Sequence, residues 1–219
     1  MRRIDRRAAA AGAECPDGGL WALEREIRAR GARRIAGVDE AGRGPLAGPV
    51  VAAAVIFPAG YSHPEINDSK RLSADRRERL YPVITAAALA WAVAEVSEAE
   101  IDRLNILQAT LRAMERALAE LAPAPDYVLV DGSVRPVLLV PGETVVGGDA
   151  RVGCIAAASI LAKVHRDRLM REHHERWPAY GFAANKGYGT AAHLAALAVH
   201  GPCTIHRRSF RPVGGCRGE

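Results

Sequence analysis

The chain has 219 residues, of which 49% are hydrophobic and 25% are charged, which is typical of one folded globular domain. This composition excludes an intrinsically disordered protein, and charged residues interrupt every apolar run before the roughly 18 residues that a membrane span needs. The formal net charge of +5 favours a polyanionic partner such as nucleic acid.

Two rare residue types add information. The four cysteines, Cys15, Cys154, Cys203 and Cys216, contain no C-x-x-C pair, so we expect reduced thiols rather than a disulfide framework or structural zinc. Only three of the 30 basic residues are lysines, and they are Lys70, Lys163 and Lys186. A general bias towards arginine makes these lysines informative, because they mark positions where a compact ammonium group is needed.

Residues 1–32 are rich in Arg and Ala. The basic start is similar to a secretory signal, but Glu14 ends the apolar patch too early for one. We therefore predict a cytoplasmic protein with an N-terminal extension over 1–32, flexible or peripheral and with a short amphipathic piece at Leu20–Ile27. One domain follows over 33–213, with a short tail over 214–219.

The first half of this domain alternates between strands and helices. Strands are predicted at Arg34–Val38, Val50–Phe57 and Leu89–Val96, and a helix capped by Ser73 runs to Leu80. A capping box at Ser97–Glu100 precedes leucines and methionine spaced by three and four up to Leu121. This spacing predicts one amphipathic helical region whose apolar stripe belongs to the core.

The second half continues the alternation. Strands are predicted at Tyr127–Val130 and Val137–Val140, and helices at Cys154–Trp177 and Thr190–Val199. The βαβ order indicates an α/β fold, and no repeat or second domain is found.

The segment from Gly42 to Ala47, GRGPLA, satisfies a dinucleotide-binding pattern. That pattern requires a helix to begin at the loop, whereas Pro45 and Pro49 interrupt this segment and a strand follows. On its own the segment is a plain turn.

Four carboxylates lie at predicted strand ends or turns: Asp39, Glu40, Asp131 and Asp149. An isolated Asp-Glu pair is most simply a solvated strand end, but neighbouring strand ends converge at one edge of a βαβ sheet. Four oxygen ligands without His or Cys suit Mg²⁺ or Mn²⁺ and disfavour zinc, and a pair of such ions suits phosphoryl transfer.

Several sequence blocks resemble bacterial ribonuclease HII, the type 2 ribonuclease H family. In chain order they are Val38–Val50 (VDEAGRGPLAGPV), Asn67–Lys70 (NDSK), Val130–Gly132 (VDG), Ala156–Lys163 (AAASILAK), Arg166–Arg168 (RDR) and Lys186–Thr190 (KGYGT). The resemblance covers about residues 34–212. It implies a ribonuclease H-like fold, which is an α/β fold of one domain with a mixed central sheet flanked by helices.

The resemblance also implies a reaction. The family cleaves the RNA strand of RNA/DNA hybrids and nicks duplex DNA 5′ of single embedded ribonucleotides, leaving a 3′-hydroxyl and a 5′-phosphate. Its four acidic positions, catalytic and metal-binding, fall on Asp39, Glu40, Asp131 and Asp149, where two Mn²⁺ or Mg²⁺ ions are expected. Asp167 is a rival fourth carboxylate, but two arginines flank it in a helix, which favours an ion pair.

Substrate-binding residues follow from the same resemblance. The backbone of Gly42, Arg43 and Gly44 is expected to read the 2′-hydroxyl, and Tyr188 to stack on the sugar of the following nucleotide. We expect phosphate contacts from Lys70 and Lys186. Lys163 is a candidate for orienting the carboxylates, and Arg207 or Arg208 is expected near the duplex.

The expected partners are RNA/DNA hybrid and ribonucleotide-containing duplex DNA, bound by a monomer without a membrane or protein partner. One alternative is a ribonuclease HIII-like enzyme that needs a run of ribonucleotides. The short segment before residue 33, and Asp149 where that family uses Glu, disfavour it. Another is a non-catalytic nucleic-acid-binding protein, which four intact carboxylates disfavour.

Overall fold

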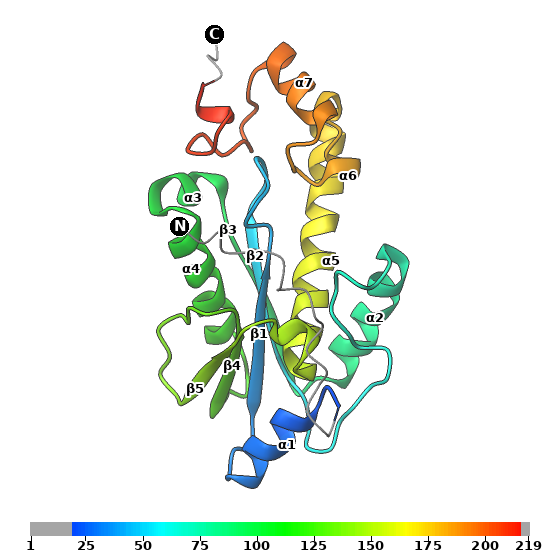
Figure 1. The fold of residues 1–219 in the computed structure, drawn as a ribbon, viewed down its shortest axis with the longest axis vertical. Helices are drawn as coiled ribbons and strands as arrows, with labels where there is room; N and C mark the ends of the chain where they lie inside the picture. Colours follow the sequence, from blue (N-terminus) through cyan, green and yellow to red (C-terminus); the bar gives the residue numbers. More distant parts are fainter. Residues whose placement is uncertain (1–18, 216–219) are drawn as a thin grey trace, which may run out of the picture.

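A five-stranded mixed sheet, in the order β3-β2-β1-β4-β5, forms the centre of the protein (Figure 1). The structure is a computed structural model and describes residues 19–215. The strands are β1 (Ile35–Ala41), β2 (Val50–Ile56), β3 (Ala90–Val96), β4 (Tyr127–Asp131) and β5 (Gly142–Val145). β1 pairs antiparallel with β2 and parallel with β4, so the predicted mixed sheet is confirmed.

Helices cover both faces of this sheet. They are α1 (Ala22–Ala29), α2 (Ala74–Ala87), α3 (Glu98–Leu104), α4 (Ile106–Ala119), α5 (Gly153–Arg176), α6 (Phe182–Asn185) and α7 (Ala191–His200). Short 3₁₀ turns occur at η1 (Gly148–Ala150), η2 (Pro178–Tyr180) and η3 (Val213–Gly215). Side chains alternate across β2, so that Val51 and Val55 pack beneath α5 while Ala52 and Ala54 pack beneath α4.

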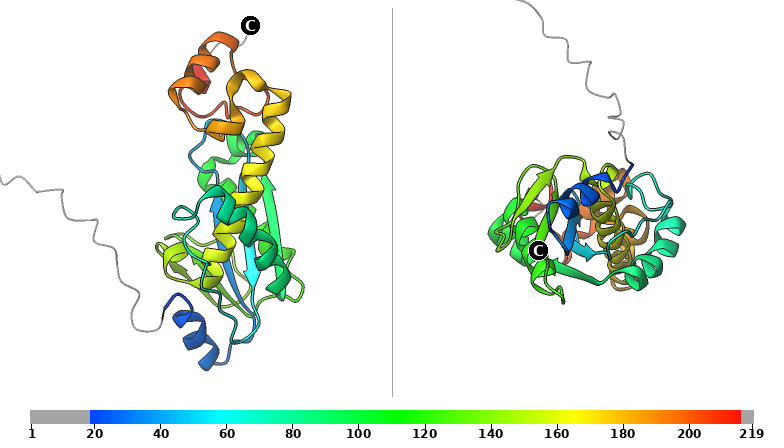
Figure 2. Two further views of the ribbon diagram at one scale, coloured as in Figure 1. Left: turned by 90° about the vertical axis from the view of Figure 1, so that its right-hand side faces the viewer. Right: turned by 90° about the horizontal axis from the view of Figure 1, so that it is seen from below.

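Helix α5 lies directly on the backbone of β1. A Cβ atom at Gly37 would stand 2.2 Å from the carbonyl carbon of Cys154, so only glycine permits this approach. The apolar first half of α5 is buried against the sheet, and its charged second half extends towards α6 and α7 (Figure 2). The segment 182–215 gathers there, at the same end of the molecule as the loop between β1 and β2.

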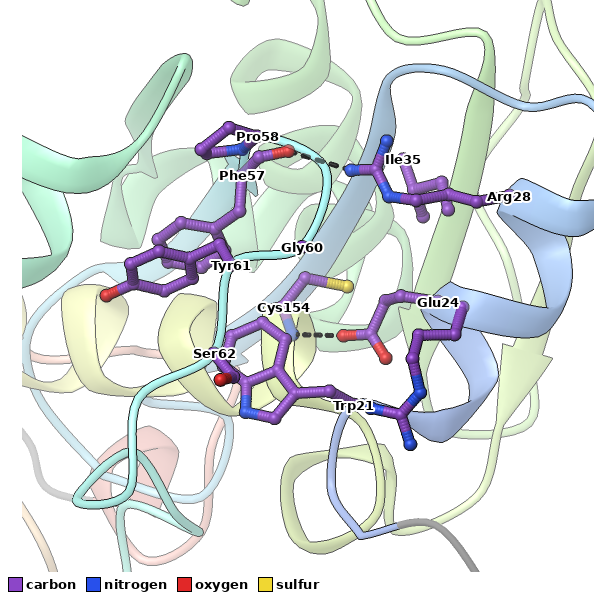
Figure 3. A pocket seen from close by; sticks show the side chains of 11 residues that line it. Trp21, Glu24, Arg28, Ile35, Phe57, Pro58, Gly60, Tyr61, Ser62 and Cys154 are labelled. Carbon is purple, nitrogen blue, oxygen red and sulfur yellow. Dashed lines mark hydrogen bonds between the residues drawn. The ribbon is translucent and has the colours of Figure 1, made fainter.

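Helix α1 belongs to the predicted N-terminal extension and packs against the start of α5 (Figure 3). The N-cap residue of α5, Val152, offers no side-chain cap. Instead the Leu20 carbonyl accepts from Gly153 N at 2.8 Å, and Glu24 Oε1 accepts from Cys154 N at 2.8 Å. α1 and the turn before it therefore satisfy two N–H groups that a helix start leaves unpaired. Residues 1–18 of the extension lie outside the described residues.

Several predicted elements differ from the structure. The helix predicted to end at Leu80 continues to Ala87 as α2, with Pro82 inside it. The helical region up to Leu121 is divided at Asn105, which has φ +70° and whose side chain accepts from the first N–H groups of α4. The strand predicted at Val137–Val140 is wrong. That segment is a loop that exposes Val137 and Leu139, and pairing with β4 begins only at Gly142, after Pro141, which has no N–H to donate to a ladder.

Within residues 19–215, no helix has the combination of length and apolar character that crossing a membrane requires.

Candidate active site

The carboxyl ends of β1 and β4 bring the first three predicted carboxylates together. The strands are parallel with Val38 opposite Val130, so the next residues, Asp39 and Asp131, lie side by side at one sheet edge. Asp39 is only 5% exposed, and its Oδ1 accepts from Glu40 N at 2.7 Å. A carboxylate at the end of a strand is ordinarily exposed to water, but this hydrogen bond holds the Asp39 carboxylate in a buried position.

The fourth carboxylate comes from η1, which precedes α5. Gly148 N donates to Asp131 Oδ1 at 2.6 Å, and this bond holds the buried Asp149 next to the end of β4. Asp149 Oδ2 accepts from Lys70 Nζ, also at 2.6 Å. Lys70 lies in the loop between β2 and α2, so residues far apart in sequence meet here.

The clustered carboxylates shift one another's ionisation. Burial raises the pKa of Asp39 well above its ordinary value, and the charges of Glu40, Asp131 and Asp149 raise it further. Burial raises the pKa of Glu40, although Arg43 opposes this from 3.3 Å. Burial and Asp149 raise the pKa of Asp131. The site holds more negative charge than its neighbours neutralise.

The pKa of Lys70 is raised as well, but for an amine this shift favours the charged form. Partial burial alone would lower the pKa of its ammonium group, but the hydrogen bond and charge of Asp149 more than offset this and raise it. The Lys70 side chain is 77% exposed, so it remains accessible from solvent.

A cavity of about 270 Å³ opens onto this edge. Its lining combines acidic, basic and glycine-rich segments: Asp39, Glu40, Ala41, Gly42, Arg43, Gly44, Ser69, Lys70, Arg77, Asp131, Ser159, Lys163, Arg166 and Tyr188. The Tyr188 ring lies near Gly44, where an added Cβ would be 3.6 Å from Cε1 of the ring. Most of the predicted site residues therefore share one cavity.

Lys186 and Asp149 are the predicted site residues outside this lining. Lys186 Nζ donates to the carbonyl of Ala183, which lies within α6. Lys163 lines the cavity and pairs with Asp167 at 2.7 Å, and Arg77 also contacts Asp167 at 3.7 Å. The interpretation of Asp167 as an ion-pair residue is confirmed.

Two buried arginines, Arg166 and Arg207, support the cavity wall, a role that the sequence patterns did not predict for either of them. Arg166 on α5 donates to the carbonyls of Ala47, Pro49 and Lys186, each at 3.0 Å. Its side chain also passes Gly42, where φ is +96° and a Cβ would lie 2.1 Å from Arg166 Nε. The glycine is thus required both by its backbone conformation and by the arginine beside it.

Arg207 holds the other side of the same loop. It donates to the carbonyls of Gly42, Arg43 and Gly48 at 2.5–2.9 Å. Arg207 is completely buried, and burial lowers its pKa to about 9. Of the two arginines expected near the duplex, Arg207 is therefore occupied by the loop carbonyls, whereas Arg208 is exposed and stays the candidate for that position. One feature of the sequence pointed to such a donor. Pro45 and Pro49 have no N–H groups, so the loop has fewer backbone donors than carbonyl groups and needs donors from elsewhere.

Comparison with known proteins now identifies the family. The family model described as ribonuclease HII matches residues 36–213. The chain belongs to the ribonuclease HII family. Ribonuclease HII 1 of Methylibium petroleiphilum is 62% identical over 81% of this chain and 90% of its own length. Ribonuclease HII of Geobacter metallireducens is 55% identical, with 89% and 91% covered.

The fold is also similar to that of a solved ribonuclease H structure. The crystal structure of ribonuclease H2 from Pyrococcus horikoshii has a TM-score of 0.72 to this structure at 25% identity, covering 83% of this chain and 96% of that one. Family membership confirms the predicted ribonuclease H-like fold and the ribonuclease H activity on RNA/DNA hybrids.

Members of the family depend on divalent metal ions, and the donor set of the cavity fits such an ion. Only oxygen ligands are present, and burial together with the neighbouring carboxylates raises the pKa of Asp39, which a bound cation would oppose. Within residues 19–215, no three acidic, His or Cys side chains form a ready-made metal cluster. Lys70 Nζ donates to one oxygen of Asp149, and the Gly148 N–H donates to one oxygen of Asp131. The other oxygen of each carboxylate accepts from neither of these donors.

Proposed function

We propose that this ribonuclease H nicks duplex DNA on the 5′ side of an embedded ribonucleotide and leaves a 3′-hydroxyl and a 5′-phosphate. One observation carries the proposal: a single cavity is lined both by Asp39, Glu40 and Asp131 and by the 42–44 loop with Tyr188. The groups suited to phosphoryl transfer and those suited to recognising a sugar are thus within reach of one nucleotide.

In this proposal Asp39, Glu40, Asp131 and Asp149 hold Mg²⁺ or Mn²⁺, two ions during catalysis. When bound, these ions activate the attacking water and stabilise the leaving 3′-oxygen. The protein orients the ligands beforehand, because the Glu40 N–H fixes Asp39 and the Gly148 N–H fixes Asp131.

The glycine-rich loop has a distinct role. Because Arg207 binds the carbonyls of Gly42 and Arg43, and a trans peptide points its N–H opposite to its C=O, the N–H groups of Arg43 and Gly44 face away from Arg207. They support recognition of the 2′-hydroxyl, the one group that separates ribose from deoxyribose. The 45% exposed Tyr188 ring offers a surface on which the next sugar stacks.

Lysine contacts complete the proposed substrate site. The exposed Lys70 ammonium group lies at the cavity rim and supports a phosphate contact. The Lys186 ammonium group donates one of its three N–H groups to the Ala183 carbonyl, so the others can contact a phosphate. We further propose that residues 33–213 form the catalytic unit and that the enzyme acts as a cytoplasmic monomer.

The test is cleavage of an end-labelled DNA duplex that contains one internal ribonucleotide, with Mg²⁺, with Mn²⁺ and with chelator. The matched variant is Asp131→Asn, which keeps the side-chain shape and removes the charge. A metal-dependent nick immediately 5′ of the ribonucleotide, lost in the variant, is expected.

Other outcomes would reassign the substrate. Cutting of a long RNA/DNA hybrid without a nick at a single ribonucleotide would indicate the specificity that needs a run of ribonucleotides. Binding without cleavage in any metal would contradict a catalytic role.

A further inference from the structure

Two buried imidazole rings lie behind the recognition loops and take no part in the proposed chemistry. His193 on α7 and His206 in the C-terminal segment are 0% and 2% exposed, and their Nε2 atoms are 3.0 Å apart. The rings of Tyr180 and Phe182 pack around them. Neither imidazole can touch a bound substrate.

The surrounding groups allow one arrangement of protons. His193 Nδ1 is 2.9 Å from the Tyr188 carbonyl, which only accepts, so this nitrogen donates. His206 Nδ1 is 3.0 Å from Cys203 N, which only donates, so this nitrogen accepts. His206 Nε2 therefore carries a hydrogen and donates to His193 Nε2. All four ring nitrogens are satisfied while both rings are neutral.

This pair joins two walls of the cavity. On one side His193 holds the main chain of Tyr188. On the other, the backbone of His206 bridges to Ala47 in the loop between β1 and β2, and the neighbouring Arg207 N donates to the Leu46 carbonyl at 2.9 Å. The Arg207 side chain continues to the Gly42 carbonyl. An unbroken chain of hydrogen bonds thus links the Tyr188 main chain to the 42–44 loop.

We propose that the His193–His206 pair is a positioning device that sets the separation between Tyr188 and the 42–44 loop, and thereby the enzyme's preference for a ribonucleotide over a deoxyribonucleotide. The proposal rests on the proposed function. His193 and His206 are positioning residues, since they act through Tyr188 and Arg207 and not on the reacting atoms.

The test compares two substitutions that differ by one methylene group. In His193→Asn, the amide nitrogen takes the place of Nδ1 and keeps the bond to the Tyr188 carbonyl. In His193→Gln, the amide reaches the place of Nε2, so it can bond to His206 but leaves Tyr188. His200→Gln is the control, because His200 is exposed on the same helix.

Binding is measured in chelator, by fluorescence anisotropy, for a duplex with one ribonucleotide and for the all-DNA duplex of the same sequence. The ratio of the two dissociation constants should fall by about five- to tenfold in His193→Gln, the factor that one buried hydrogen bond supplies. His193→Asn keeps the Tyr188 bond but loses the bond to His206, so it breaks the same chain and should lower the ratio by a similar factor, whereas His200→Gln should keep the whole ratio. With metal, His193→Gln should raise KM while kcat at saturation is maintained.

The outcomes separate this inference from the proposed function. A wild-type enzyme that binds both duplexes equally would overturn this inference, whereas only the absence of the nick in the cleavage assay would overturn the proposed function. A wild-type preference that survives in His193→Gln would overturn this inference alone, as would a full preference in His193→Asn, which lacks the bond to His206. Thermal unfolding of each variant identifies any general loss of folding, and a lower Tm with an unchanged ratio indicates a purely structural role.

Discussion

The acidic edge of the sheet and the arginines behind the recognition loops are both buried charged regions, yet their partners differ. Arg166 and Arg207 each donate to at least three carbonyl groups. Asp39 receives the Glu40 N–H and lies near the carboxylates of Glu40, Asp131 and Asp149, with Lys70 as a cation close to it. The recognition side is complete as folded, whereas the chemical side keeps an excess of negative charge that a bound cation would neutralise.

The largest expected effect comes from removing one of these charges. Asp39→Asn should lower the cleavage rate by about 10³-fold or more, because metal ions supply several kcal/mol of transition-state stabilisation. It should also stabilise the metal-free protein by about 0.5–2 kcal/mol, since a repelled charge is lost. Cleavage assays and denaturant unfolding in chelator check both effects. A destabilised Asp39→Asn protein would contradict the excess of negative charge.

The arginines should behave in the opposite way. Arg207→Met leaves the carbonyls of Gly42, Arg43 and Gly48 without their donor, and we expect it to lower the free energy of unfolding by about 4 kcal/mol. The control is Arg208→Gln, an exposed neighbour that should change stability by less than about 0.5 kcal/mol. Equal effects of the two substitutions in urea unfolding would show that burial of Arg207 does not support the fold.

These two regions also differ in how far the sequence predicted them. The carboxylates were predictable because an acid that ends a buried strand has a fixed place at the sheet edge. Arg207 lies in a basic run that is typical of a solvated segment, and its burial depends on the loop of residues 42–49, which is more than 150 positions away. Local patterns do not contain that long-range contact.

The same reasoning explains the secondary-structure differences. The spacing that predicted one helix to Leu121 is correct on both sides of Asn105, but spacing does not report a single left-handed residue that caps the next helix. At Val137–Val140 the apolar run suggested a strand, although the prolines beside it limit pairing.

The roles of Lys70 and Lys186 in phosphate binding stay predictions.

The stability of the two regions should depend on pH in opposite ways, and His206, the residue before Arg207, is the titrating group on the recognition side. Burial lowers the pKa of His206 to about 4 in the folded protein, below about 6.5 when unfolded. The stability that the neutral ring contributes is therefore present above pH 6.5 and is lost as the pH falls towards 4. His206→Gln, which cannot titrate, should remove about 2 to 3 kcal/mol of this dependence. His193, Cys203 and Arg208 are the neighbours that influence this ring.

The acidic edge contributes with the opposite sign. Because the folded pKa values of Asp39 and Glu40 are raised, the folded protein takes up their protons first as the pH falls, and stability increases. Unfolding measured from pH 7 to pH 4 for the wild type, Asp39→Asn and His206→Gln separates the two contributions. Identical pH profiles for the three proteins would contradict both.

The smallest expected effect concerns α1. Glu24→Ala removes the cap on Cys154 N and should lower stability by about 1 kcal/mol, as losing a helix cap typically does. Glu26→Ala on the same helix breaks only an exposed pair with Arg30 and should cost less than about 0.5 kcal/mol. Thermal unfolding distinguishes the two variants, and equal Tm values would contradict the capping role.

The scarcity of lysine has a practical chemical consequence. A reagent that acylates amines finds, besides the chain's amino terminus, only Lys70, Lys163 and Lys186. Two of these line the cavity, and the Lys70 side chain is 77% exposed. Acylating agents modify lysines over the whole surface of most proteins. Here most of the reactive lysines lie at the active site, and Lys70 is the more exposed of the two that line the cavity.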